Sequence, residues 1–376
     1  MSAEPPVPPA LLAALRAPFL AAGATPIDPP TLLPLSLILE LSGEAMRERL
    51  LIAQLNGGAE MALRPDFTIA AARHHIESGR REGRYVYEGK AYRAPATAPG
   101  EPDEHLQIGL EAFEQRAAPA ADAETAAIAW RAAAAGGRSD LSLVLGDVSL
   151  FGAFLESLGL SQPARTRLMR VADNPERLAE VMASAGAAAT DSRGDPLAGL
   201  LAHLEEAEAA RALEAIWELA GVEPAGGRTA AEIAHRLASR SPARSPGVTA
   251  EQAERIDRYL SVAGEPAASL DEVARLAGPE RRALEDLLEG WAVRLAELKS
   301  EGAPASTSRL VTAFRREFAY YDGVFFEVRS AALGPERPVA AGGRYDGLFG
   351  RLGASLDCGA VGCMVRPARA WAGSES

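Results

Sequence analysis

Apolar and polar positions follow two different periods in the first 160 residues. Alternation at every second residue, which is typical of a half-buried strand, occurs in residues 84–92 (RYVYEGKAY) and 106–113 (LQIGLEAF). We expect these two segments to pair as an antiparallel hairpin around a loop at 94–104. The other elements predicted in this part are strands at 62–66 and 141–145 and helices at 68–76, 122–135 and about 149–158.

The pattern becomes helical between about residues 160 and 310, where almost no strand signal is found. Capping boxes, in which a Ser or Thr is followed three residues later by Glu or Gln, mark the starts of helices. They occur at Thr229 with Glu232, at Thr249 with Gln252 and at Ser269 with Glu272. We therefore expect a helical unit at 161–304.

Strand patterns return at the end of the chain. Residues 323–329 and 359–365 are predicted strands, and residues 339–341 are predicted to lead into a turn at Gly342 and Gly343. Strands on both sides of a helical block predict an α+β fold, in which one antiparallel sheet is flanked by helices and carries a helical insertion. The expected domains are a discontinuous core, formed by 1–160 with 305–376, and the insertion at 161–304.

Composition narrows the range of partners. The 376 residues carry a formal net charge of −12, and 48% of them are hydrophobic, as in a globular protein with a sizeable core. Because an acidic surface does not attract a polyphosphate, we do not expect nucleic acid as the main ligand. The N-terminal residues contain neither a basic leader nor an apolar run that could span a bilayer, so we expect no membrane association and a cytoplasmic location.

The sequence gives no indication of a metal or a cofactor. The two cysteines, Cys358 and Cys363, are too few for a disulfide framework or a structural zinc site, and we expect them to be small buried hydrophobic residues. His74 and His75 are adjacent, so on a helix they point in different directions and make a poor metal site. The sequence has no Walker A, Rossmann, HExxH or nucleophile-elbow pattern.

Two segments of the first part place polar side chains where a ligand can bind. Asp66 and Thr68 follow a predicted strand, where a carboxylate suits a ligand ammonium group, but either residue can instead cap the next helix. Gln107 and Glu111 share one face of a predicted strand, and Arg93 follows the end of its partner strand. Such a face lines a pocket or faces solvent, and the sequence leaves both choices open.

Two segments of the last part are further candidates. Tyr320 and Tyr321 follow Arg316 and can stack on a planar ring or form hydrogen bonds with it, whereas the alternative is packing in the core. In AGGRYDGL (341–348), the two glycines allow a positive φ or a close backbone approach. Arg344 and Asp346 of this segment can also pair across a turn.

The order and spacing of these segments resemble the class II core of histidyl-tRNA synthetases. The motifs are LRPDFT (63–68), a strand that ends at Tyr92 and Arg93, LQIGLEAF, LVLGDVSLF (143–151), YYDGVFFE (320–327) and AGGRYDGL. The likeness covers about 25–160 and 305–370, and the last two motifs look like the histidine-recognition signatures of that family. Residues 27–44 resemble the dimer-forming first class II motif, the segment around Arg93 the second, and 359–369 a decayed third.

The resemblance implies a pocket for free histidine. Asp66 takes the place of the glutamate that receives the α-ammonium group, and Arg316 that of the arginine near the ligand carboxylate. The tyrosine pair 320–321 matches the side chains around the imidazole ring. The full histidine-binding set that the resemblance implies is Asp66, Thr68, Arg93, Gln107, Glu111, Arg316, Tyr320 and Tyr321.

Departures from the family pattern imply that catalysis is lost. Residues 94–104 contain three acidic residues and no Lys or Arg, whereas the synthetases hold the ATP phosphates there with cations. Arg366 and Pro367 interrupt the glycine-rich start of the third motif, and Ala319 replaces an acidic residue. The resemblance also implies that the anticodon-binding domain, which follows in synthetases, is missing here. We therefore expect no catalytic residues.

A histidine pocket without ATP chemistry resembles the histidyl-tRNA synthetase-like regulatory subunits of ATP phosphoribosyltransferase, a glycosyltransferase. This resemblance implies a role in the first step of histidine biosynthesis, with L-histidine as the feedback effector. The expected protein partners are the short-form catalytic subunit and a second copy of this chain, as a homodimer within a hetero-oligomer. The alternatives are a histidyl-tRNA synthetase, or a synthetase-like histidine-sensing module for another partner.

Overall fold

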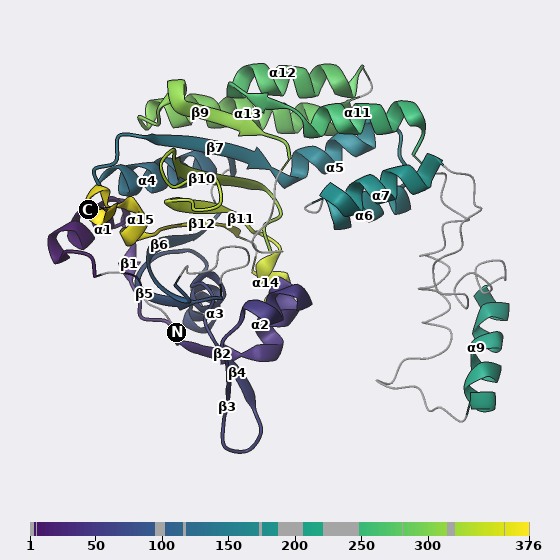
Figure 1. Ribbon diagram of the computed structural model, residues 1–376, viewed down its shortest axis with the longest axis horizontal. Coiled ribbons are helices and arrows are strands. Elements are labelled where there is room, and N and C mark those ends of the chain that lie inside the picture. Colours follow the sequence, from purple (N-terminus) through teal and green to yellow (C-terminus); the bar gives the residue numbers. More distant parts are fainter. Residues whose placement is uncertain are drawn as a thin grey trace. The chain divides into compact units, whose positions relative to one another are not determined.

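The chain forms two compact units in a computed structural model (Figure 1). The first unit comprises Met1–Phe151 and Ser261–Ser376, and the second comprises Gly152–Leu260. No helix within the described ranges is both long and apolar enough to cross a membrane. The structure describes residues 4, 6–94, 102–115, 118–172, 175–186, 206–220, 248–279, 281–313, 320–356 and 358–375.

A nine-stranded sheet forms the centre of the first unit, in the order β1-β5-β6-β12-β11-β10-β7-β9-β8 (Figure 1). The neighbours from β5 to β7 are all antiparallel, whereas β1 and β9 join their neighbours β5 and β7 in parallel. Strands from the two ends of the chain therefore lie side by side, which confirms the predicted α+β fold. The strands are β1 (Thr25–Pro26), β5 (Gly83–Tyr92), β6 (Glu104–Glu114), β7 (Leu141–Asp147), β8 (Ala263–Gly264), β9 (Ser308–Val311), β10 (Val324–Ser330), β11 (Ala340–Arg344) and β12 (Gly359–Val365).

Strands β5 and β6 form the predicted hairpin. Its register pairs Tyr85 with Glu111 and Gly89 with Gln107. Strand β6 is also paired with β12 on its other side, so it is an interior strand of the sheet. Gln107 and Glu111 are each only 1% exposed. The sequence left open whether this face lines a pocket or faces solvent. In the structure the face is covered, so it does not face solvent.

The predicted turn at Gly342 and Gly343 is wrong, because both residues lie inside strand β11. A Cβ atom at Gly342 would lie 2.3 Å from the carbonyl oxygen of Gly362, and one at Gly343 would lie 2.9 Å from the ring of Tyr321. The two glycines are needed for close packing within the sheet and against the site. The predicted pairing of Arg344 with Asp346 is confirmed at 2.8 Å.

Helix α4 (Ala118–Ala134) packs against β10, β11 and β12 and is in turn contacted by α1 (Pro9–Ala21) and α13 (Arg282–Ser300). Its buried positions are mostly alanines, whose small side chains let the helix approach the sheet closely. Asp122 is the charged exception, at 2% exposure. Its two carboxylate oxygens accept hydrogen bonds from Arg294 at 2.8 Å and from Arg344 at 2.7 Å.

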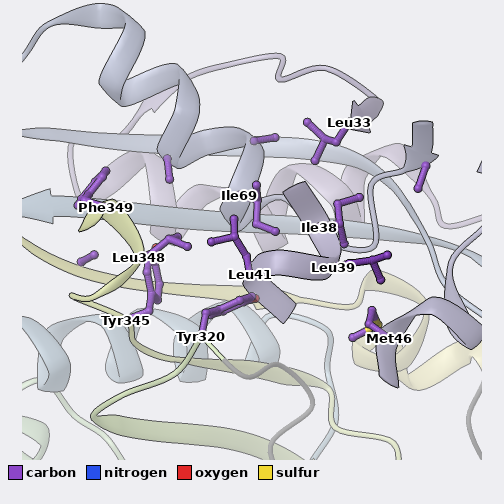
Figure 2. Close-up of a cluster of buried hydrophobic side chains, with 14 of the residues drawn as sticks. Leu33, Ile38, Leu39, Leu41, Met46, Ile69, Tyr320, Tyr345, Leu348 and Phe349 are labelled. Atoms are coloured by element: carbon purple, nitrogen blue, oxygen red, sulfur yellow. The ribbon is translucent and has the colours of Figure 1, made fainter. Parts of the chain in front are cut away.

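A second, three-stranded sheet has the order β2-β4-β3 and consists of β2 (Leu32–Pro34), β3 (Ile52–Gln54) and β4 (Glu60–Leu63). It adjoins a hydrophobic cluster to which α2 (Leu35–Ser42), α3 (Thr68–Ser78) and α14 (Leu348–Arg351) contribute. Figure 2 shows this cluster, in which Leu41 and Ile69 lie next to each other and Tyr320 and Tyr345 are also members. The first unit also contains η1 (Glu44–Arg49), α12 (Pro266–Ala277), η4 (Ala305–Thr307), α15 (Pro367–Ala370) and η5 (Ala372–Glu375).

The described part of the second unit is helical. Its capping box at Thr249 and Gln252 is confirmed, because each side chain accepts a hydrogen bond from the backbone N–H of the other, at 3.2 and 2.9 Å. The box predicted at Thr229 lies outside the described residues. Helix α5 (Val148–Ser157) leads into this unit, and α6 (Gln162–Val171), α7 (Pro175–Gly186), α9 (Glu206–Ala220) and α11 (Ala250–Leu260) follow.

The segment 261–304, which the sequence places in the insertion, belongs to the first unit instead. Strand β8 of this segment pairs with β9, and the indole N–H of Trp291 on α13 donates to Asp147 at 2.9 Å. The capping box predicted at Ser269 is also wrong, because that residue lies inside α12. Glu265 is the N-cap, and its side chain accepts from the Ala268 N–H.

Candidate functional site

Seven of the eight candidate residues line one cavity in the first unit. Its empty space amounts to about 430 Å³ when the solvent at its mouth is included. Arg316, the eighth candidate, lies outside the described residues. The seven that the structure brings together are Asp66, Thr68, Arg93, Gln107, Glu111, Tyr320 and Tyr321.

These side chains lie close together because the ends of strands and the start of a helix meet over strand β6. Asp66 and Thr68 stand at the start of α3, while Gln107 and Glu111 project from β6 with the period of two. Gly362 on β12 faces Glu111 in the register of the sheet. A Cβ atom at Gly362 would lie only 1.7 Å from Glu111 Oε2, so the carboxylate occupies the space that a side chain would need.

Asp66 lines the cavity and also accepts a hydrogen bond at the start of α3. Its Oδ1 accepts from the Thr68 N–H at 2.9 Å, which stabilises the start of α3, and its Oδ2 accepts from the Tyr320 hydroxyl at 3.3 Å. Burial raises the pKa of Asp66 to about 6, although the charge of Arg93 opposes this rise. A ligand ammonium group in the cavity would offset the same burial cost.

Glu111 is the most densely hydrogen-bonded group of the cavity. Its carboxylate accepts from the hydroxyls of Thr68 at 2.8 Å, Tyr87 at 3.4 Å and Tyr345. Burial nevertheless raises the pKa of Glu111 to about 8, and the nearby carboxylate of Asp66 adds to the rise. The cavity therefore contains two carboxylates that favour a cationic ligand.

Gln107 presents an acceptor to the same cavity. Its Nε2 donates to Nε2 of His105 at 3.3 Å, while its buried Oε1 has no hydrogen-bond partner among the described residues. A buried acceptor without a partner is costly, and a ligand N–H group would satisfy it.

The two tyrosines differ in environment. Tyr320 is 3% exposed and belongs to the hydrophobic cluster (Figure 2), so the alternative of core packing also holds for this residue. Its hydroxyl still reaches Asp66 in the cavity. Tyr321 is half-buried, and its ring lies 5.0 Å from that of Tyr320. The two tyrosine rings therefore form an aromatic wall of the cavity, next to its polar side chains.

Sequence reasoning missed Tyr87, Tyr345 and Gly362. Tyr87 lines the cavity, and its ring stacks on that of Phe67 with 4.2 Å between the ring centroids. The guanidinium carbon of Arg64 lies 3.9 Å from the centroid of the Phe67 ring. The alternating pattern of 84–92 could have indicated Tyr87, and Tyr345 lies within the AGGRYDGL motif. Nothing in the sequence indicates that the missing side chain of Gly362 makes room for Glu111.

The arrangement is suited to binding a small ligand. Burial raises the pKa of the Cys363 thiol, which therefore remains protonated and unreactive at the cavity wall. The described residues contain no group of three or more His, Cys, Asp or Glu side chains that could hold a metal ion. Two carboxylates, one amide oxygen, one arginine and an aromatic wall together provide complementary contacts for a small zwitterion with a planar ring.

Known proteins share both the sequence and the fold. Residues 9–367 match the family model described as histidyl-tRNA synthetase. A protein of Brucella anthropi named ATP phosphoribosyltransferase regulatory subunit is 32% identical over 346 residues, which cover 90% of each chain. A protein of the same name from Mesorhizobium japonicum is 32% identical over 377 residues, which cover 95% of each chain.

Solved structures agree at the level of the fold. A crystal structure titled as an ATP phosphoribosyltransferase regulatory subunit/histidyl-tRNA synthetase, from Bacillus halodurans, has a TM-score of 0.63 at 20% identity and covers 96% of this chain and 77% of its own. A histidine–tRNA ligase subunit from Alicyclobacillus acidocaldarius has a TM-score of 0.58 at 23% identity, with coverage of 96% and 91%. The chain therefore belongs to the histidyl-tRNA synthetase family and, within it, to the ATP phosphoribosyltransferase regulatory subunits.

Proposed function

We propose that this chain is a non-catalytic subunit that senses free L-histidine and regulates ATP phosphoribosyltransferase. The observation that carries the proposal is the buried acidic cavity at Asp66, Gln107 and Glu111, in a chain whose relatives are named regulatory subunits. In this role the chain supports the first step of histidine biosynthesis. It lowers the activity of the complex when histidine accumulates.

Each part of zwitterionic histidine has a complementary group in the proposed mode of binding. The α-ammonium group binds the Asp66 carboxylate and the Oε1 atom of Gln107, which otherwise has no hydrogen-bond partner among the described residues. The imidazole ring lies against the tyrosine pair and donates to Glu111. We assign the ligand carboxylate to Arg93, which lines the same cavity, and to Arg316 through its place in the family motif.

Adenylation of the bound histidine is not part of the proposal. The loop after Arg93 contains acidic residues and no Lys or Arg, so it lacks the cations that hold a transferring phosphoryl group. We infer that the chain keeps the amino-acid pocket of its family and has lost the chemistry performed there.

The proposed partners are the short-form catalytic subunit and a second copy of this chain, in a cytoplasmic hetero-oligomer. Feedback then requires that histidine bind the less active state of the assembly more tightly than the active state. By linkage, substrates that favour the active state weaken histidine binding by the same factor.

Reconstitution tests the proposal. The chain is mixed with a short-form catalytic subunit, and phosphoribosyl transfer to ATP is measured with and without histidine. We expect activity to depend on the chain and to fall when histidine is added. A catalytic subunit that works equally well without the chain would disprove the regulatory role, and full activity at saturating histidine would disprove the sensing role.

A separate assay addresses the enzymatic alternative. Histidine-dependent exchange between ATP and pyrophosphate reports adenylate formation by a synthetase. We expect no exchange above the background of a protein-free control, and measurable exchange would show that the chain is an active synthetase.

A further inference from the structure

Asp322 joins two segments that are distant in the sequence. Its Oδ1 accepts from the backbone N–H of Asp346 at 3.1 Å, and its Oδ2 accepts from the backbone N–H of Gly347 at 2.7 Å. The backbone N–H of Asp322 in turn donates to the carbonyl oxygen of Arg344 at 3.1 Å. The side chain and the backbone of Asp322 are therefore both bound to the residues that lead from β11 to α14.

Two glycines allow the close approach of these segments. A Cβ atom at Gly347 would lie 2.9 Å from Asp322 Oδ2, and one at Gly323 would lie 3.2 Å from three side-chain carbons of Arg344. Because carbon atoms in van der Waals contact are about 3.5–4.0 Å apart, a side chain at either position would push the segments away from each other. The contact therefore depends on glycine at both positions.

Each segment carries a tyrosine whose hydroxyl donates to a carboxylate of the cavity. The hydroxyl of Tyr320 donates to Asp66 at 3.3 Å, and that of Tyr345 donates to Glu111. The two tyrosine rings lie 5.8 Å apart. Both tyrosines are close in sequence to a hydrogen bond that Asp322 forms, so Asp322 restrains both side chains through the backbone.

Asp322 itself lies outside the cavity. The described residues that line the cavity do not include it, and it is exposed to solvent. Its carboxylate is already used by two backbone N–H groups. An effect of Asp322 on a ligand in the cavity must therefore act through the segments that it holds together.

We propose that Asp322 is a positioning residue of the cavity, which holds the hydroxyls of Tyr320 and Tyr345 on the two carboxylates. Because residues 320–323 and 344–347 are fixed to each other, both donors are in place before a ligand arrives. A preorganised cavity binds its ligand with a smaller cost of ordering. The inference rests on the proposed function for its ligand, since it is the affinity for histidine that Asp322 increases.

The first measurement uses the full-length chain without a ligand. NMR of protein that is isotopically labelled at the tyrosine Cζ atoms reports the surroundings of each hydroxyl. We expect Asp322→Ala to shift the signals of Tyr320 and Tyr345, which the variants Tyr320→Phe and Tyr345→Phe identify. The signal of Tyr259, which stacks on Phe154, should stay in place. Unchanged signals of both cavity tyrosines would overturn the inference.

The second measurement is histidine binding by calorimetry. We expect Asp322→Ala to raise the Kd by about tenfold or more, because two hydrogen bonds to a charged group are lost. Asp322→Asn keeps one acceptor oxygen and should have an intermediate Kd. Gly347→Ala keeps the charge but places a Cβ atom 2.9 Å from Oδ2, and it should also weaken binding. The control is Asp271→Ala, which removes an exposed carboxylate from α12 and should bind as the unmodified chain does.

A further variant tests whether Asp322 acts through the tyrosines. In a chain with Tyr320→Phe and Tyr345→Phe, adding Asp322→Ala should change the Kd by less than about twofold, because the hydroxyls that Asp322 positions are absent. Circular dichroism verifies that each variant is folded. The inference is overturned if Asp322→Ala binds histidine as tightly as the Asp271 control, or if its effect is equally large without the two hydroxyls.

Failure of the proposed function gives a different result. If the unmodified chain binds no histidine, the sensing role is wrong. The tyrosine signals of the free protein then decide by themselves whether Asp322 positions the two side chains.

Discussion

Asp66 and Glu111 are two carboxylates that face one cavity with little water around them. Asp66 is 7% exposed and Glu111 is 1% exposed, and burial raises the pKa of both groups. Each carboxylate is therefore easily protonated in the free protein and is stabilised in its charged form by a cation. A cation that binds in the cavity would therefore displace protons from these carboxyl groups.

Asp66→Asn should weaken histidine binding strongly. The amide can still accept the Thr68 N–H, so α3 keeps its start, but the ligand ammonium group loses its counter-charge. Loss of one partner of a buried charge pair costs about 2–5 kcal/mol, which corresponds to roughly 30- to 1000-fold in Kd by calorimetry. Glu77→Gln on the exposed side of α3 is the control and should bind as the unmodified chain does.

The pH dependence of the same variant gives a second test. The pKa of Asp66 is raised to about 6, so its carboxylate becomes protonated, and histidine affinity falls, as pH drops below about 6. The imidazole of the ligand titrates in this range with both proteins, so the difference between them isolates Asp66. Parallel pH profiles for Asp66→Asn and the unmodified chain would contradict this assignment.

Glu111 makes the stability of the free protein depend on pH. Its pKa in the folded state is about 8, above the value near 4.5 of an exposed glutamate. The folded state therefore binds one proton more than the unfolded state between these values. The stability associated with protonated Glu111 is fully present below about pH 4.5 and is lost as pH rises through 8.

Glu111→Gln should reduce this dependence. The amide is neutral at every pH. The free energy of unfolding of the variant should therefore not show the decrease of about 1.4 kcal/mol per pH unit that release of one proton causes in the unmodified chain between pH 5 and 8. Urea unfolding of both proteins at pH 5.5 and 7.5 measures the difference. Equal changes in the free energy of unfolding would mean that Glu111 does not hold the proton.

At the residue scale, sequence reasoning identified those side chains whose type and position both point to a ligand. Asp66 and Gln107 could be proposed because polar residues follow a predicted strand or share its face. The contact of Tyr345 with Glu111 could not be predicted, since the two residues meet only after β12 has paired with both β6 and β11. The role of Gly362 depends on a side chain that is 251 positions away in the chain, so no local pattern contains it.

At the scale of elements, local periodicity predicted β5, β6 and β12 well, since their patterns are regular over seven or more residues. Strand β11 was assigned partly to a turn because two glycines are the usual sign of one. The reason for the glycines is tertiary, as the carbonyl of Gly362 and the ring of Tyr321 occupy the positions of their side chains.

Asp122 joins three elements, since it lies on α4 and binds arginines on α13 and β11. Asp122→Ala leaves Arg294 and Arg344 buried without this carboxylate, so we expect a loss of about 3–5 kcal/mol in the free energy of unfolding. Denaturant unfolding measures the loss. The control is Asp271→Ala at an exposed position of α12, and a change as small as that of the control would show that the arginines find other partners.

At the scale of the whole molecule, the sequence predicted that two distant parts of the chain form one sheet. The boundary of the insertion was harder to place, because the pattern of 261–304 is helical like that of 161–260. Tertiary contacts associate α13 with the first unit, among them the packing of α13 on α4 and the contacts of Trp291 and Arg294 with Asp147 and Asp122. Such contacts leave no periodic signal.

The three hydroxyls that converge on Glu111 come from positions 68, 87 and 345. During synthesis Tyr345 leaves the ribosome long after Thr68 and Tyr87. A nascent chain that ends before Tyr345 would therefore lack one of the three donors that hold Glu111 in place, and the cavity would have its full set of hydrogen bonds only after that position has been translated.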